Sequence, residues 1–118
     1  MTRQQYLDQV IRIYLAAPGA PHKPTRRDWA IAAALYRLRV TISELEHSIR
    51  LANLRRLLSG PDPLPPIRSL AYYRTVLQEL TPDERDPDYV RYVRQRHRQL
   101  SHHPSSKTAP KPPESRAL

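Results

Sequence analysis

The sequence predicts an all-α protein, with a compact four- to five-helix domain over residues 1–100 and a tail over residues 101–118. Apolar residues recur at spacings of three and four in five stretches, and no stretch shows the alternation typical of a β-strand. Helix start signals, in which a Thr precedes Gln, Asp or Glu by three residues, support this interpretation. These threonines are Thr2, Thr25, Thr41 and Thr81.

A central helix-turn-helix-like hairpin is predicted over residues 25–58, which contain the densest apolar pattern in the chain. In its first helix we expect an apolar face of Trp29, Ala33 and Tyr36, because these residues recur at helical spacing. Ile31, Leu35 and Leu38 are expected beside this face. The second helix is expected to bury Ile42, Leu45, Ile49 and Ala52. Ser59 and Gly60 follow this helix and are expected to end it.

This hairpin is a candidate DNA-binding helix-turn-helix, because that motif needs small or apolar residues on both helices and just after the turn. The matching residues are Ala34, Leu38, Val40, Leu45 and Ile49. However, Arg39 occupies a position where such turns usually have a glycine with positive φ. Glu44 and Glu46 would also repel phosphates. The alternative is a plain helical hairpin whose apolar stripes only form core.

Helices are expected on both sides of the hairpin. One should follow Thr2, another should extend from about residue 67 to Leu80, and a short turn at Thr81 should precede the last helix, residues 87–100. Residues 60–66 contain four prolines and are expected to form an extended connector. Residues 101–118 contain four prolines and almost no apolar side chain, which predicts a disordered basic tail.

A strong positive charge is the main indication of function. The formal net charge is +9, from twenty Lys and Arg against eleven Asp and Glu, and seventeen of the twenty are Arg. Guanidinium groups match phosphate geometry, and an excess of them is typical of proteins that bind nucleic acid. The charge leaves open that the protein is basic without having a polyanionic partner.

The expected phosphate contacts lie on the polar sides of the second hairpin helix and the last helix. They are Arg50, Arg55, Arg56, Arg91, Arg94 and Arg98. Ser43 and His47 are candidates for reading base edges, and exposed tyrosines such as Tyr72 or Tyr92 for stacking on unpaired bases. For the last helix a structural explanation is also open, since acids at its start and arginines towards its end complement the helix dipole.

The composition also excludes several classes of protein. Without cysteine the chain has no disulfide and no thiolate zinc site, and its glycines, at positions 19 and 60 alone, form no phosphate-binding loop. We therefore expect a protein that is not an enzyme and has no cofactor and no metal site. No apolar run has membrane-spanning length and the N-terminus lacks a signal peptide, so we expect a soluble, cytoplasmic protein without a membrane partner.

Short motifs within residues 24–80 resemble a known domain. Thr25, Asp28 and Trp29 match its opening, residues 41–44 its middle, and the run Tyr-Arg-Thr-Val at residues 73–76 its last helix. The domain is the small helical one at the C-terminal end of bacterial and plasmid replication primases. Arg39 stands near the place of that family's turn glycine, and the catalytic primase domain is absent. The resemblance implies an accessory role in replication or in a mobile element, without polymerisation.

The sequence therefore leaves two functions open. The first is a small basic accessory protein that binds nucleic acid, DNA rather than RNA, in replication or transposition of a mobile element, alongside a larger replication or recombination protein. The alternative is a protein-interaction adaptor, which docks on a larger partner through an apolar helix face. Salt should separate them, because phosphate binding weakens as salt rises and apolar docking need not.

Overall fold

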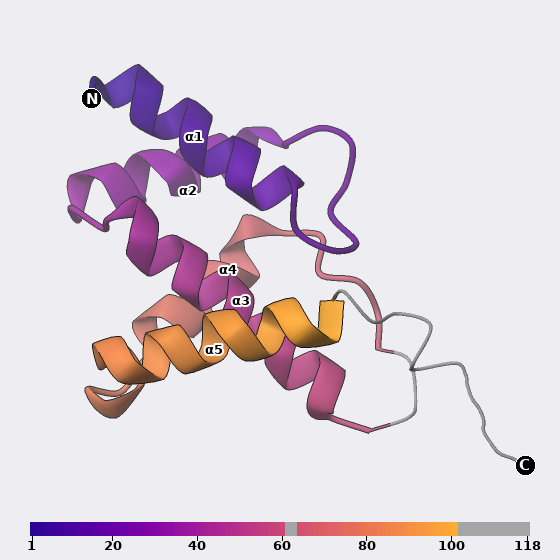
Figure 1. Cartoon of the computed structure of the whole chain (residues 1–118). Coiled ribbons are helices and arrows are strands. Elements are labelled where there is room, and N and C mark those ends of the chain that lie inside the picture. The colour runs from indigo at the N-terminus through magenta and orange to yellow at the C-terminus, as the bar shows by residue number, and fades with distance from the viewer. Residues whose placement is uncertain (61–63, 102–118) are drawn as a thin grey trace, which may run out of the picture.

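The computed structural model describes residues 1–60 and 64–101, which form five α-helices and one short 3₁₀ turn and contain no strand (Figure 1). The elements are α1 (Arg3–Leu15), α2 (Arg26–Arg37), α3 (Ile42–Leu58), α4 (Leu70–Gln78), η1 (Asp83–Arg85) and α5 (Pro87–Ser101). The all-α prediction is thus confirmed. The predicted tail begins at Ser101, the last residue of α5, and residues 102–118 lie outside the described residues.

All four predicted start signals form capping boxes. At the starts of α1, α2 and α3 the threonine hydroxyl accepts a hydrogen bond from the backbone amide of the residue three positions later. The side chain of that residue accepts in turn from the backbone amide of the threonine. Thr81 and Glu84 make the same exchange, at 2.9 and 3.2 Å, around the short turn η1 that precedes α5. Each box satisfies amides that have no partner within a helix, which stabilises the start by about 1 kcal/mol.

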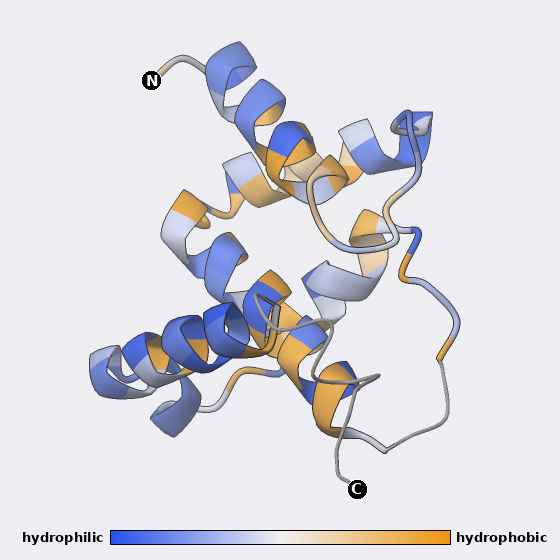
Figure 2. Ribbon diagram, turned by 45° about the vertical axis from the view of Figure 1, so that its right-hand side comes forward, coloured by the Kyte–Doolittle hydropathy of each residue, from blue (hydrophilic) through white to orange (hydrophobic). Residues whose placement is uncertain are grey.

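Helix α3 is the centre of the fold. It packs against α1, α4 and α5, while α2 packs against α1 and α4. Buried residues therefore lie on several sides of α3, since Leu51 and Leu54 are as fully enclosed as the predicted Leu45 and Ala52. A helix with neighbours on three sides needs apolar residues around most of its circumference. In Figure 2 hydrophobic segments accordingly gather on α3, and α5 is mostly hydrophilic.

The buried face of α2 differs from the predicted one. It contains Asp28, Ile31, Ala32 and Leu35. Trp29 and Ala33 are only partly buried against the core, and Tyr36 is 37% exposed. The prediction was right for Ile31 and Leu35 and wrong for the face of Trp29, Ala33 and Tyr36. It followed apolar residues alone, whereas the inward stripe begins with a charged residue, Asp28.

The Asp28 carboxylate joins the starts of two helices. One oxygen accepts from the amide of Thr25 at 2.9 Å, which completes the capping box of α2. The other accepts from the amide of Leu70, the first residue of α4, at 3.2 Å. Both helices present partial positive charge there, so the carboxylate is stabilised although it is only 2% exposed. This contact fixes α4 against α2.

Candidate nucleic-acid interface

Helix α5 has an inner face against the core and an outer face of arginines. On the inner face Val93 is fully buried, and Tyr89 and Leu100 are partly buried. The exposed arginines are Arg91, Arg94 and Arg98. Their spacing of three and four residues places them on one side of the helix. We refer to these three residues as the α5 face.

The arginines of the α5 face are accessible to a phosphate. Arg91 forms an ion pair with Asp88, and both side chains are largely exposed. Arg94 and Arg98 form no ion pair with any residue that the structure describes. An exposed ion pair contributes about 0–1 kcal/mol, so Arg91 can exchange its carboxylate for a phosphate oxygen at little cost.

The predicted arginines of α3 are less available. Arg50 is partly buried, Arg55 forms an ion pair with Glu84, and Arg56 donates to the carbonyl oxygen of Pro65. The last two side chains thus tie the end of α3 to η1 and to the connector before α4. Of the three, Arg50 alone has no recorded ion pair or hydrogen bond from its side chain to a described residue.

Glu84 holds η1 against α3 through several contacts. The amide of Thr81 donates to its carboxylate and, with help from the Arg55 guanidinium, holds the pKa of Glu84 below its ordinary value. Its backbone carbonyl oxygen lies 2.7 Å from Nε2 of His47. Since a carbonyl oxygen only accepts, Nε2 of His47 is the donor in this bond.

A base-reading role for His47 is contradicted by the structure. The side chain is only 4% exposed, and its ring packs edge-on against Tyr89 of α5 at a centroid distance of 6.1 Å. The prediction was wrong because α5 covers this side of α3, a contact that the local pattern of α3 does not reveal. Ser43, the other base-reading candidate, is exposed near the start of α3.

The hairpin turn has one feature of a helix-turn-helix and lacks another. Arg39 has a φ of 59°, so a residue with positive φ occurs where that motif has one. However, a recognition helix must enter the major groove, which is about 12 Å wide and admits a single helix. Because α1, α4 and α5 pack around α3, the α3 helix is a core element, as the plain-hairpin alternative requires.

Two predicted stacking residues do lie at the surface. Tyr72 on α4 is 46% exposed and Tyr92 on α5 is 53% exposed. The rings of Tyr92 and Tyr89 are tilted by 33° with their centroids 6.1 Å apart, so Tyr92 is supported on one side by a partly buried neighbour. Tyr92 follows Arg91 by one residue and precedes Arg94 by two, so helical spacing places its ring on a different side of α5 from the three arginines.

Other kinds of site find little support. Within residues 1–60 and 64–101 no group of three or more His, Asp or Glu is arranged to hold a metal ion. None of the helices in this part of the chain is long and apolar enough to cross a membrane. No protein-family model, curated protein or solved structure matches this chain.

Proposed function

We propose that this protein binds nucleic acid through the α5 face, with unpaired DNA as the preferred ligand. The observation that carries the proposal is the row of three exposed arginines on one side of α5, and the exposed Tyr92 lies on another side of the same helix. Arginines bind the phosphates of a single strand, and an aromatic ring stacks on its bases without regard to sequence. The net charge of +9 supports the same ligand.

The α3 arginines have a reduced part in this proposal. Arg55 and Arg56 would have to break contacts that hold the end of α3, so Arg50 is the one residue of that group we add to the interface. Ser43 lies on α3 one turn before Glu46, whose carboxylate disfavours a nearby phosphate, and we assign it no contact. The resemblance of residues 24–80 to a primase domain supports a role as an accessory in replication or transposition.

Fluorescence anisotropy with a labelled single strand and a labelled duplex, across a salt series, tests the proposal. If these four arginines (Arg50 and the three of the α5 face) contact phosphates, log affinity should fall against log salt with a slope of roughly −2.8 for the single strand and roughly −3.6 for the duplex. The Arg94→Ala/Arg98→Ala variant should lower either slope by about half. Tyr92→Ala should weaken single-strand binding by about 1–3 kcal/mol and affect the duplex less.

A matched control is available on α1, which lies at the opposite end of the molecule from α5 in Figure 1. Arg3 and Arg12 are exposed there, and the Arg3→Ala/Arg12→Ala variant removes the same amount of charge. This control should retain the wild-type salt slope. Equal losses in both variants would mean that net charge, and not the α5 face, is responsible. Absence of binding at low salt would reject the proposal and favour the adaptor alternative.

A further inference from the structure

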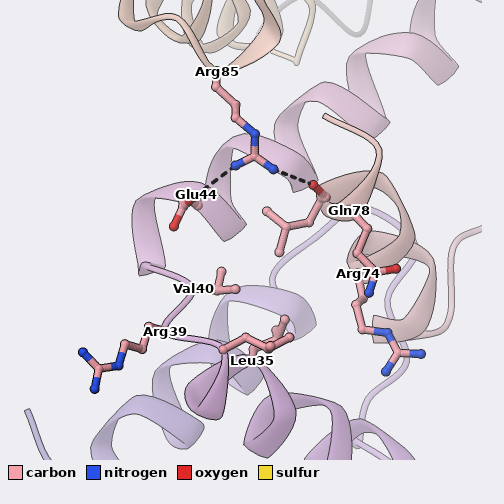
Figure 3. A pocket seen from close by; sticks show the side chains of 9 residues that line it. Leu35, Arg39, Val40, Glu44, Arg74, Gln78 and Arg85 are labelled. Carbon is pink, nitrogen blue, oxygen red and sulfur yellow. Dashed lines mark hydrogen bonds and ion pairs between the residues drawn. The ribbon is translucent and has the colours of Figure 1, made fainter. Parts of the chain in front are cut away.

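A second surface, at the turn between α2 and α3, has no part in the proposed nucleic-acid interface. On one side of the turn a hollow of about 250 Å³ lies between the turn and α4. Its apolar walls are Leu35, Val40 and Leu77. Arg39, Arg74 and Arg85 surround it, and in Figure 3 Arg85 lies above the hollow with Arg39 and Arg74 on either side. We refer to this hollow, its three arginines and Leu38 as the turn surface.

Two residues of the turn surface are unfavourable for the stability of the isolated chain. Leu38 is 66% exposed, so its apolar side chain stays largely in water. Arg39 has a φ of 59°, a left-handed conformation that costs a residue with a side chain about 1 kcal/mol or more and that glycine adopts freely. Backbone strain of this kind is concentrated at binding sites, where a particular side chain is needed in that place.

The charge of the turn surface is also uncompensated. Glu44 is the one acid that lines the hollow, and it is already paired with Arg85 at 3.2 Å, while Arg85 donates in addition to the carbonyl oxygen of Leu77. Two guanidinium groups, on Arg39 and Arg74, therefore have no acid beside them among the described residues. The Nε of Arg74 is buried without a hydrogen-bond partner in this part of the chain, which leaves a donor unsatisfied.

We propose that the turn surface docks an acidic segment of a partner protein. The segment would insert one apolar side chain into the hollow and place carboxylates on Arg39 and Arg74. The size is suitable, because a cavity of about 150 Å³ already holds a benzene molecule. Leu38 would cover the inserted side chain, since apolar surface flanking a filled pocket excludes water from it.

A peptide fits this surface better than nucleic acid does. The walls of the hollow include Leu35, Val40 and Leu77, so it suits an apolar amino-acid side chain better than a phosphate. A carboxylate-bearing peptide needs fewer positive charges than a phosphate chain and gains from burying an apolar side chain. This inference is independent of the proposed function, because none of its residues belongs to the α5 face.

The test is a selection of random twelve-residue peptides displayed on yeast against the full chain. We expect the enriched peptides to contain Asp or Glu around a single Leu, Phe or Trp. An enriched peptide, synthesised with a fluorescent label, should bind Leu38→Ser and Arg74→Ala about tenfold more weakly than the wild type, equivalent to about 1.4 kcal/mol. The Arg12→Ala control should bind within about twofold of the wild type.

Arg39→Gly separates binding from folding. Glycine relieves the strained backbone, so this variant should unfold at a higher urea concentration than the wild type and yet bind the peptide more weakly. A selection that enriches no peptide, or peptides that bind the three variants as well as the wild type, would overturn the inference. It would also be overturned if single-stranded DNA displaced the peptide and Arg74→Ala weakened DNA binding, because the surface would then belong to nucleic acid.

Discussion

Two acidic residues, Asp28 and Glu84, have the same local task and very different surroundings. Each is the fourth residue of a capping box and each also contacts a distant element. Asp28 is enclosed and its distant partner is a backbone amide, whereas Glu84 is near the surface and its distant partner is the guanidinium of Arg55. We infer that the buried Asp28 holds α2 and α4 together and that the more exposed Glu84 mainly positions η1.

Replacing the buried Asp28 should have the largest effect on stability and is the strongest test of its difference from Glu84. Asp28→Ala removes both hydrogen bonds and leaves the buried amide of Leu70 without a partner, so it should lower the free energy of unfolding by about 3 kcal/mol. Urea denaturation followed by circular dichroism measures this. Asp8→Ala, an exposed acid on α1, is the control and should change stability by less than about 0.5 kcal/mol. Equal effects of the two substitutions would contradict the special role of Asp28.

The contribution of Glu84 to the stability of the fold should change with pH in a defined direction. Because the pKa of Glu84 is lower in the folded protein than its ordinary value of 4.5, its contribution is present above pH 4.5 and is lost as the pH falls below it. Glu84→Gln should therefore be less stable than the wild type by up to about 1 kcal/mol at pH 7 and equally stable near pH 2. The check is a set of urea midpoints between pH 7 and pH 2.

Glu79, exposed at the end of α4, provides the control for that titration. Glu79→Gln should have the same urea midpoint as the wild type at every pH. A gap between Glu84→Gln and the wild type that persisted at pH 2 would show that shape, and not charge, makes the contribution of Glu84.

The smallest expected effect at neutral pH concerns a tyrosine near Asp28. Burial, with a contribution from the Asp28 charge, raises the pKa of Tyr14 to about 12, and its hydroxyl has no hydrogen-bond partner among the described residues. The folded state therefore loses stability as the pH rises above 10, where the unfolded chain ionises more readily. Tyr14→Phe should change the free energy of unfolding by less than about 1 kcal/mol at pH 8. Between pH 8 and pH 11 this variant should lose less stability than the wild type loses.

Tyr92→Phe, on the exposed outer side of α5, is the matched control and should follow the wild type at both pH values. Part of the alkaline loss should remain in Tyr14→Phe, because burial also raises the pKa of Tyr6 and Tyr73. If Tyr14→Phe lost as much stability as the wild type at pH 11, Tyr14 would not be the group that titrates with the fold.

What the sequence predicts well here depends on short-range chemistry. Each capping box joins residues three apart, so its partners are visible in the sequence and all four are formed. The second bond of Asp28 reaches Leu70, 42 positions away, and no local pattern indicates it. The inward face of α2 was predicted only in part for the same reason, since a charged residue such as Asp28 is buried only where a distant partner receives it.

The same distinction between local spacing and distant contacts applies to the candidate site. Exposure of Arg91, Arg94 and Arg98 follows from helical spacing, because apolar residues of α5 mark its opposite side. Burial of His47 does not follow, because it depends on where α5 crosses α3. The engagement of Arg55 and Arg56 by Glu84 and Pro65 likewise requires the path of the chain after α3.

The central position of α3 has a consequence for synthesis on the ribosome. Two of its three neighbours, α4 and α5, follow it in the chain. The side of α3 that α5 covers therefore stays uncovered from the synthesis of Leu58 until Ser101 has been translated. At roughly 5–20 residues per second that interval lasts several seconds. The nascent chain is therefore most prone to aggregate between the synthesis of α3 and that of α5, and a chaperone that binds apolar helices would recognise it then.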